Sequence, residues 1–90
     1  MLTFLITSPY EADADRAASA LATAIRAKDP KVFMAGPHTA GISKLKDIYR
    51  RIVYLKHDDY EHLVEIKDAV EPLSRDDLRF AKVQIFTDFD

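Results

Sequence analysis

The chain of 90 residues carries 13 basic and 15 acidic side chains, a net charge of −2 and an apolar fraction of 48%. This composition excludes a disordered chain, and the length suits a single domain over residues 1–90 with one hydrophobic core. The lack of cysteine excludes disulfides, thiolate catalysis and cysteine-ligated metals within these residues, and we expect no cofactor.

The N-terminal apolar run is short. It covers residues 1–6, has no basic flank and leads directly into acidic residues, so it lacks the pattern of a signal peptide. No segment approaches the roughly 18 consecutive apolar residues that a membrane helix requires. We therefore expect a cytoplasmic protein with no membrane partner.

The first forty residues predict a strand, a helix and a second strand. Residues 2–7 form an apolar run rich in β-branched and aromatic side chains, which is typical of a strand buried on both faces. Apolar residues recur at helical spacing from Ala14 to Ile25, and Asp29-Pro30 ends that helix. Residues 31–35 predict a second buried strand, ended by Gly36-Pro37. We expect these three elements to form a right-handed parallel βαβ unit.

This first third resembles a known family. Phe4-Leu5-Ile6-Thr7-Ser8, the alanine-rich helix and Val32-Phe33-Met34-Ala35-Gly36 are similar to the opening βαβ unit of the small DsrE-like sulfur-relay proteins. The resemblance stops near Gly41. Members of that family that transfer sulfur use a cysteine, which this chain lacks, so the resemblance implies a βαβ unit and none of the chemistry.

Residues 43–55 predict a second helix followed by a third strand. Leu45, Ile48, Tyr49 and Ile52 have the i, i+3, i+4, i+7 spacing of one helical face, and Ser43 precedes them as an N-cap. The apolar segment 52–55 then predicts the strand.

Residues 58–71 allow two structures. A helix places Leu63, Ile66, Val70 and Leu73 on one side. A strand over residues 60–66 instead alternates Tyr60, His62, Val64 and Ile66. The charged residues among them are poor strand formers, so we favour the helix. Further along, Ser74 predicts the cap of a short helical turn over residues 75–81, and residues 83–87 predict a closing strand.

The resulting order β-α-β-α-β-α-β predicts a small three-layer α/β domain with a mostly parallel sheet of about four strands. If residues 60–66 form a strand, the sequence fits an α+β ferredoxin-like sheet instead. The two alternatives differ in where the segments after the strands lie.

In the parallel version, the segments after the strands meet at one sheet edge, where helix N-termini can hold phosphate or carboxylate groups. We therefore predict a nucleotide- or phosphate-binding site formed by Ser8, His38, Thr39, Gly41, Lys56 and His57. Neither GxxxxGK[ST] nor GxGxxG is present, and no spacing links the histidines to Ser8. We predict no catalytic residue and no metal site, because helix capping accounts for the paired aspartates.

Basic residues gather on the predicted second helix: Lys44, Lys46, Arg50 and Arg51. Such a patch can follow a phosphate backbone, which gives a hypothesis of nucleic-acid contact. Basic residues near a helix C-terminus also complement its dipole, and Asp47 interrupts the patch, so we favour a solvated helix face over a nucleic-acid partner.

The leading hypothesis is a small non-enzymatic interaction protein that acts through protein contacts and self-association. A domain of this size leaves strand edges exposed, and residues 83–86 are the candidate for pairing with another copy or with a different protein. Asp88 and Asp90 add charge to the same strand. Binding of a small phosphorylated ligand is the alternative.

Overall fold

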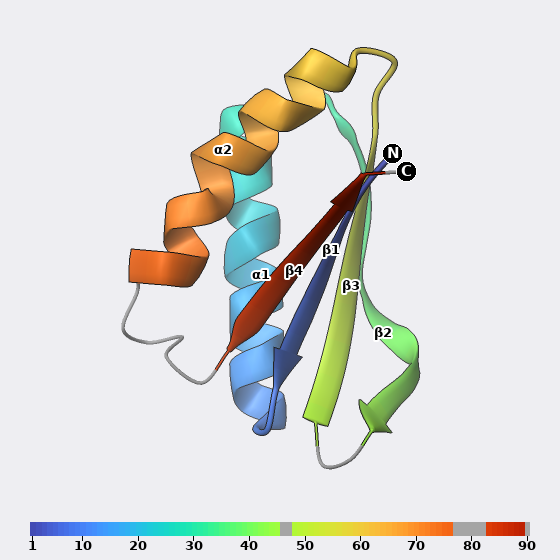
Figure 1. Cartoon of the computed structure of the whole chain (residues 1–90), viewed down its shortest axis with the longest axis vertical. Coiled ribbons are helices and arrows are strands. Elements are labelled where there is room, and N and C mark those ends of the chain that lie inside the picture. The colour runs from blue at the N-terminus through green and yellow to red at the C-terminus, as the bar shows by residue number, and fades with distance from the viewer. Residues whose placement is uncertain (46–47, 77–82, 90) are drawn as a thin grey trace.

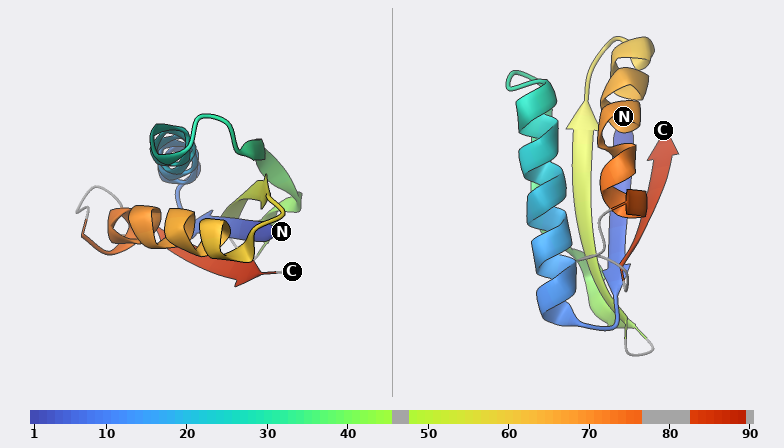
Figure 2. Two further views of the ribbon diagram at one scale, coloured as in Figure 1. Left: turned by 90° about the horizontal axis from the view of Figure 1, so that it is seen from above. Right: turned by 90° about the vertical axis from the view of Figure 1, so that its left-hand side faces the viewer.

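Six elements make up the computed structural model, which describes residues 1–45, 48–76 and 83–89. The four strands form one sheet in the order β2-β3-β1-β4, and each neighbouring pair is antiparallel. Both helices lie on the same face of this sheet (Figures 1 and 2). The elements in chain order are β1 (Leu2–Ser8), α1 (Glu11–Lys28), β2 (Phe33–Leu45), β3 (Ile48–Lys56), α2 (Tyr60–Asp76) and β4 (Gln84–Phe89).

The predicted fold class is wrong. The sheet contains no parallel neighbours, because β3 lies between β1 and β2 and runs antiparallel to both. The arrangement β-α-β-β-α-β is the α+β ferredoxin-like one, which the sequence allowed as the alternative. That alternative was based on a strand over residues 60–66, whereas the structure has a helix there and obtains its fourth strand from residues 33–56. The resemblance to the DsrE-like proteins implied that β1 and β2 are neighbours in a parallel βαβ unit. This expectation is also wrong, because β3 separates the two strands.

The predicted second helix does not form, because its residues belong to two paired strands. β2 continues to Leu45 and β3 begins at Ile48, with Lys44 opposite Tyr49. The helical spacing of the apolar residues misled the prediction, since residues 48–55 are also rich in the β-branched and aromatic side chains that favour strands. Every second residue from Arg51 to Leu55 is buried, which is the period of a strand.

The Gly36-Pro37 pair does not end the second strand as predicted. β2 passes through it with a register shift between Ala35 and His38. Gly36 has a φ of 101°, and a Cβ atom there would lie 2.6 Å from the carbonyl oxygen of Ile52. Only glycine fits this close approach, so the residue that resembled a strand terminator permits a bulge within a long strand.

The favoured helix over residues 58–71 is confirmed, since α2 begins at Tyr60 and buries Leu63, Ile66 and Val70. α2 extends to Asp76, so Ser74 lies inside it and does not begin a new helix. The rest of the predicted turn, residues 77–81, lies outside the described residues. The predicted closing strand is present as β4.

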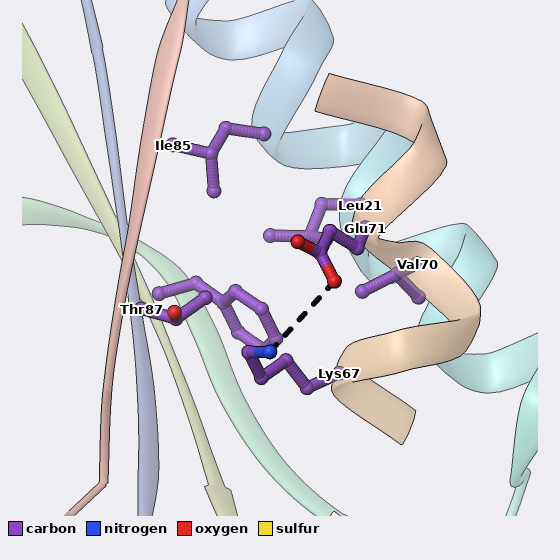
Figure 3. Close-up of a pocket in the computed structure, with 7 residues that line it drawn as sticks. Leu21, Lys67, Val70, Glu71, Ile85 and Thr87 are labelled. Atoms are coloured by element: carbon purple, nitrogen blue, oxygen red, sulfur yellow. Dashed lines mark ion pairs between the residues drawn. The ribbon is translucent and has the colours of Figure 1, made fainter. Parts of the chain in front are cut away.

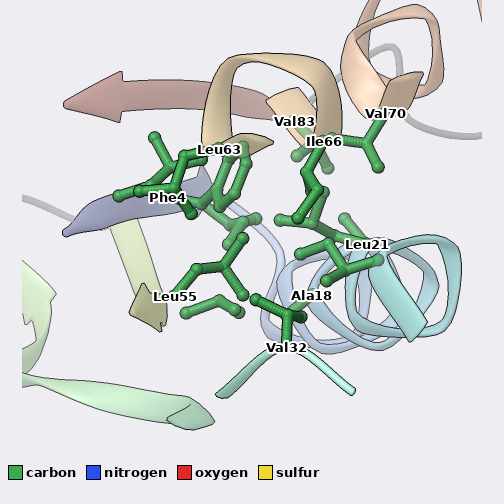
Figure 4. Close-up of a cluster of buried hydrophobic side chains, with 14 residues drawn as sticks. Phe4, Ala18, Leu21, Val32, Leu55, Leu63, Ile66, Val70 and Val83 are labelled. Carbon is green, nitrogen blue, oxygen red and sulfur yellow. The ribbon is translucent and has the colours of Figure 1, made fainter. Parts of the chain in front are cut away.

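The core lies between the helices and one face of the sheet (Figure 4). β1 directs Leu2, Phe4 and Ile6 into it, each no more than 1% exposed, while the residues between them are half-buried. This alternation corrects the expectation that the first strand is buried on both faces. α1 contributes Leu21, Ile25 and a row of buried alanines, which let the helix approach the sheet closely.

Truncating Ile66 tests the orientation of α2. The Ile66→Ala variant should lose about 2–5 kcal/mol of unfolding free energy, because it leaves a cavity in the core. The exposed neighbour is the matched control, and Glu65→Ala should change stability by less than about 0.5 kcal/mol. Urea denaturation measures both, and equal effects would contradict the observed helix face.

Candidate functional site

The residues predicted to hold a phosphate do not meet in the structure. β1 and β3 are antiparallel, with Ser8 opposite Tyr49 and Leu2 opposite Leu55. Ser8 therefore lies at one end of the sheet, whereas Lys56 ends β3 at the other end and His57 follows it. The common edge on which the prediction depended exists only in a parallel sheet. Binding of a phosphorylated ligand stays a prediction, and its predicted residues do not form one site.

Each predicted ligand-binding residue has its own local setting. Ser8 is buried, and its Oγ accepts a hydrogen bond from the backbone N–H of Tyr10 at 3.1 Å, which fixes the turn into α1. His38 and Thr39 are exposed on β2, opposite Ile52 and Arg51. Gly41 also belongs to β2. Lys56 lies over the ring of Phe33 with its Nζ 6.0 Å from the centroid, a distance typical of a cation–π contact.

The predicted basic patch is divided between the two faces of the sheet. Arg51 points toward α1, and its side chain is 9% exposed. Its Nε donates to Asp15 Oδ1 at 2.7 Å and its Nη2 to Glu11 Oε2 at 3.2 Å. The hydrogen bond with Asp15, chiefly, raises the pKa of Arg51 above its usual value. Arg51 therefore holds α1 against β3 instead of presenting charge to a partner, which corrects its place in the basic surface.

Arg50 belongs to the opposite face. It lies across from Thr7 in the sheet, and neighbouring residues in a strand point to opposite sides. Lys44 belongs to the strand β2 and not to a helix, and Lys46 lies outside the described residues. Over the described residues, the predicted basic helix is therefore replaced by two strands.

The face of the sheet turned away from the helices is the most extensive candidate surface. We call it the open face, because no described helix or strand covers it (Figure 2). Its members are identified by the strand register and by alternation along each strand. They are Thr3, Leu5, Thr7, Phe33, Ala35, His38, Arg50, Ile52, Tyr54, Lys56, Gln84, Phe86 and Asp88.

An apolar row crosses the open face. Leu5 lies opposite Ile52 on β3 and opposite Phe86 on β4, so three apolar side chains stand side by side. Phe86 is 53% exposed, and Phe33 at the β2 end of the same face is 59% exposed. Large aromatic side chains with this exposure add to an apolar surface whose contact with water is unfavourable.

Charge is distributed unevenly over the open face. Arg50 and Lys56 lie on β3, and the carboxylate of Asp88 lies on the edge strand β4. Thr3 separates Asp88 from Tyr54 in the same row. The face therefore has an apolar middle with basic groups toward one side and an acidic group at the other.

A histidine that the sequence did not single out connects the two helices. His62 of α2 contacts Asp29, the residue that ends α1, with Nε2 2.5 Å from Oδ2. This hydrogen bond is the main reason that the pKa of His62 is raised and that the pKa of Asp29 is lowered. The ring of His57 packs against that of His62 with centroids 4.5 Å apart.

Neither a membrane span nor a metal centre is found in the part of the chain that the structure describes. No helix there is long and apolar enough to cross a membrane. Within the same residues, no group of three or more histidine and acidic side chains is placed to hold a metal ion.

Comparison with known proteins supports the fold. No protein-family model matches the chain, and no curated protein matches it significantly. A de novo designed protein, Foldit4, has a similar structure, with a TM-score of 0.68 and 15% sequence identity over 99% of this chain and 94% of the designed one. Identity this low makes the likeness one of fold alone, and fold does not determine function.

The two adjacent arginines should differ in their effect on stability. Arg51→Met should lower the unfolding free energy by about 1–2 kcal/mol, because it removes two charge-assisted hydrogen bonds whose carboxylates are partly solvated. Arg50→Met, the control on the open face, should change it by less than about 0.5 kcal/mol. Chemical denaturation compares them, and a larger loss from Arg50→Met would contradict the assignment of the two faces.

The contact between His62 and Asp29 should make stability depend on pH. A raised His62 pKa stabilises the fold below about pH 6.5, the unfolded value, and this contribution disappears as pH rises through the folded pKa. A lowered Asp29 pKa stabilises it above the unfolded value of 3.8, and this contribution disappears as pH falls through the folded pKa. The stability difference between the wild type and His62→Gln should therefore be greatest between about pH 4 and 6.5.

Denaturation of both proteins at pH values across and outside this window measures the effect. Asp29→Asn should reproduce the same pH profile, because it removes the other partner of the contact. A stability difference that does not change with pH would contradict the role of the pair.

Proposed function

We propose that the chain is a non-enzymatic interaction domain that associates with a second copy of itself through the open face. The observation that supports this most directly is the apolar row of Leu5, Ile52 and Phe86, together with the exposed Phe33 opposite Lys56 on the same face. Exposed aromatic residues in an apolar patch are characteristic of interface centres. Among the described residues, the core cluster lies on the other face of the sheet.

The shape of the surface favours a self-complementary contact. Two sheets can pack face to face about 10 Å apart with their inward side chains interdigitated. A two-fold axis parallel to the strands places β4 of one copy over β2 and β3 of the other. The apolar rows then meet, with Phe86 near His38 and Leu5 near Ile52 of the second copy.

Charge complementarity favours the same orientation. In this register Asp88 on β4 lies over Ala35 on β2 of the second copy, diagonally across from Lys56 on the neighbouring strand β3, and the reciprocal arrangement forms by symmetry. Such pairs at an interface rim set orientation more than affinity. A single-stranded nucleic acid would use the aromatic and basic residues but would be opposed by Asp88 and by the net charge of −2.

The open edge of β4 provides a second contact of the kind expected from the sequence. Among the described strands, β4 pairs with β1 alone and forms the edge of the sheet. Edge strands of this kind accept a further strand from another chain. The face and the edge share Phe86, which lies on both.

Replacing Phe86 should abolish self-association without unfolding the domain. Size-exclusion chromatography with light scattering should give wild-type masses that rise above 10.2 kDa with concentration. The Phe86→Glu variant should weaken association at least roughly 30-fold, which corresponds to the loss of a hot spot of about 2 kcal/mol. Tyr10→Glu is the matched control, because Tyr10 is 55% exposed but does not belong to the sheet.

Two results would contradict the proposal. One is a wild-type chain that stays monomeric up to about 1 mM, where an interface worth roughly 4 kcal/mol is half occupied. The other is a monomer that binds a single-stranded oligonucleotide with steep salt dependence, which would assign the open face to nucleic acid.

A further inference from the structure

A pocket of about 240 Å³ lies on the helix side of the sheet, between α2 and the strands β1 and β4 (Figure 3). Its apolar lining comes from Phe4, Leu21, Val70 and Ile85. A dry apolar cavity of about 150 Å³ is enough to take up benzene. The pocket therefore has room for a hydrophobic group of the size of a leucine or phenylalanine side chain.

The polar lining consists of one cation, one anion and one hydroxyl. Lys67 and Glu71 lie one turn apart on α2, with Lys67 Nζ 3.7 Å from Glu71 Oε2, and Thr87 faces them from β4 (Figure 3). Lys67 Nζ is also 3.5 Å from Asp68 Oδ1. These distances exceed the roughly 2.7–2.9 Å of a tight charge-assisted hydrogen bond.

The charged groups can contact a ligand while they stay paired with each other. An ammonium group has three donors, and a carboxylate accepts at up to about four positions. A ligand head that offers both an anion and a cation can bind Lys67 and Glu71 together. A ligand with a single charge is attracted by one of these two side chains and repelled by the other.

We infer that this pocket binds a free α-amino acid with an apolar side chain. The ligand carboxylate contacts Lys67, its ammonium group contacts Glu71, and its side chain lies against Phe4, Leu21 and Val70. Thr87 offers a hydroxyl to the same head group. A phosphate ester fits this set poorly, since Glu71 repels the phosphate and the floor of the pocket is apolar.

The pocket is independent of the proposed self-association. Phe4 faces the pocket, whereas its neighbour Leu5 belongs to the open face on the other side of β1. A substitution in one surface therefore leaves the other in place, and the two ideas can fail separately.

Titration with free leucine and phenylalanine, followed by two-dimensional amide NMR, tests the inference. Saturable shifts should appear in α2 and β4, and ligand binding should also raise the thermal unfolding midpoint. The matched probes are 4-methylpentanoate, which lacks the amine of leucine, and 3-methylbutylamine, which lacks its carboxylate. Each should bind at least about tenfold more weakly than leucine, and glycine should not saturate.

Variants of the charged pair identify the site. Glu71→Gln and Lys67→Gln should each weaken leucine binding at least about tenfold, whereas Glu65→Gln on the same helix should leave it unchanged. Glu65 is 66% exposed, whereas Lys67 and Glu71 are partly buried, so circular dichroism checks that all three variants fold. The inference is overturned if neither amino acid shifts the pocket residues, if the singly charged probes bind as well as leucine, or if the shifts fall on the open-face residues of β3, a strand that does not line the pocket.

Discussion

Burial of the sheet on one side is the constraint on which the rest of the structure depends. The chain provides two long helices, and both pack on the face formed by Leu2, Phe4 and Ile6 of the central strand. Because side chains alternate along a strand, the residues between Leu2, Phe4 and Ile6 then point to the other face. The register of β1 therefore determines both the core and the composition of the surface that stays uncovered.

Local sequence patterns predicted the secondary structure correctly where one pattern dominated. The alanine-rich segment predicted α1, and the spacing of Leu63, Ile66 and Val70 predicted α2 against a competing strand pattern. They failed over residues 43–55, where apolar residues fit both a helix and a strand. Pairing with β1 and β2 decided the outcome, because antiparallel neighbours supply hydrogen bonds that local propensity does not reveal.

The candidate sites followed from the topology more than from individual residues. Grouping Ser8 with Lys56 and His57 required parallel strands, so the error in fold class separated them. Exposed Phe33 and Phe86 were not recognisable as surface residues, because their faces depend on register. Arg51 shows the same limit, since only the structure brings Asp15 and Glu11 beside a residue 36 and 40 positions away. The contact of His62 with Asp29 likewise joins segments distant in sequence.

Cross-strand nuclear Overhauser contacts of Leu5 test the central claim most directly. The structure predicts backbone contacts of β1 with β3 on one side and β4 on the other, with Leu5 across from Ile52 and Phe86. The same spectrum should lack direct backbone contacts between β1 and β2. Contacts of a parallel pair between Phe4 and Met34, without the contacts of Leu5 to Ile52 and Phe86, would contradict the sheet order. They would also contradict the assignment of the open face.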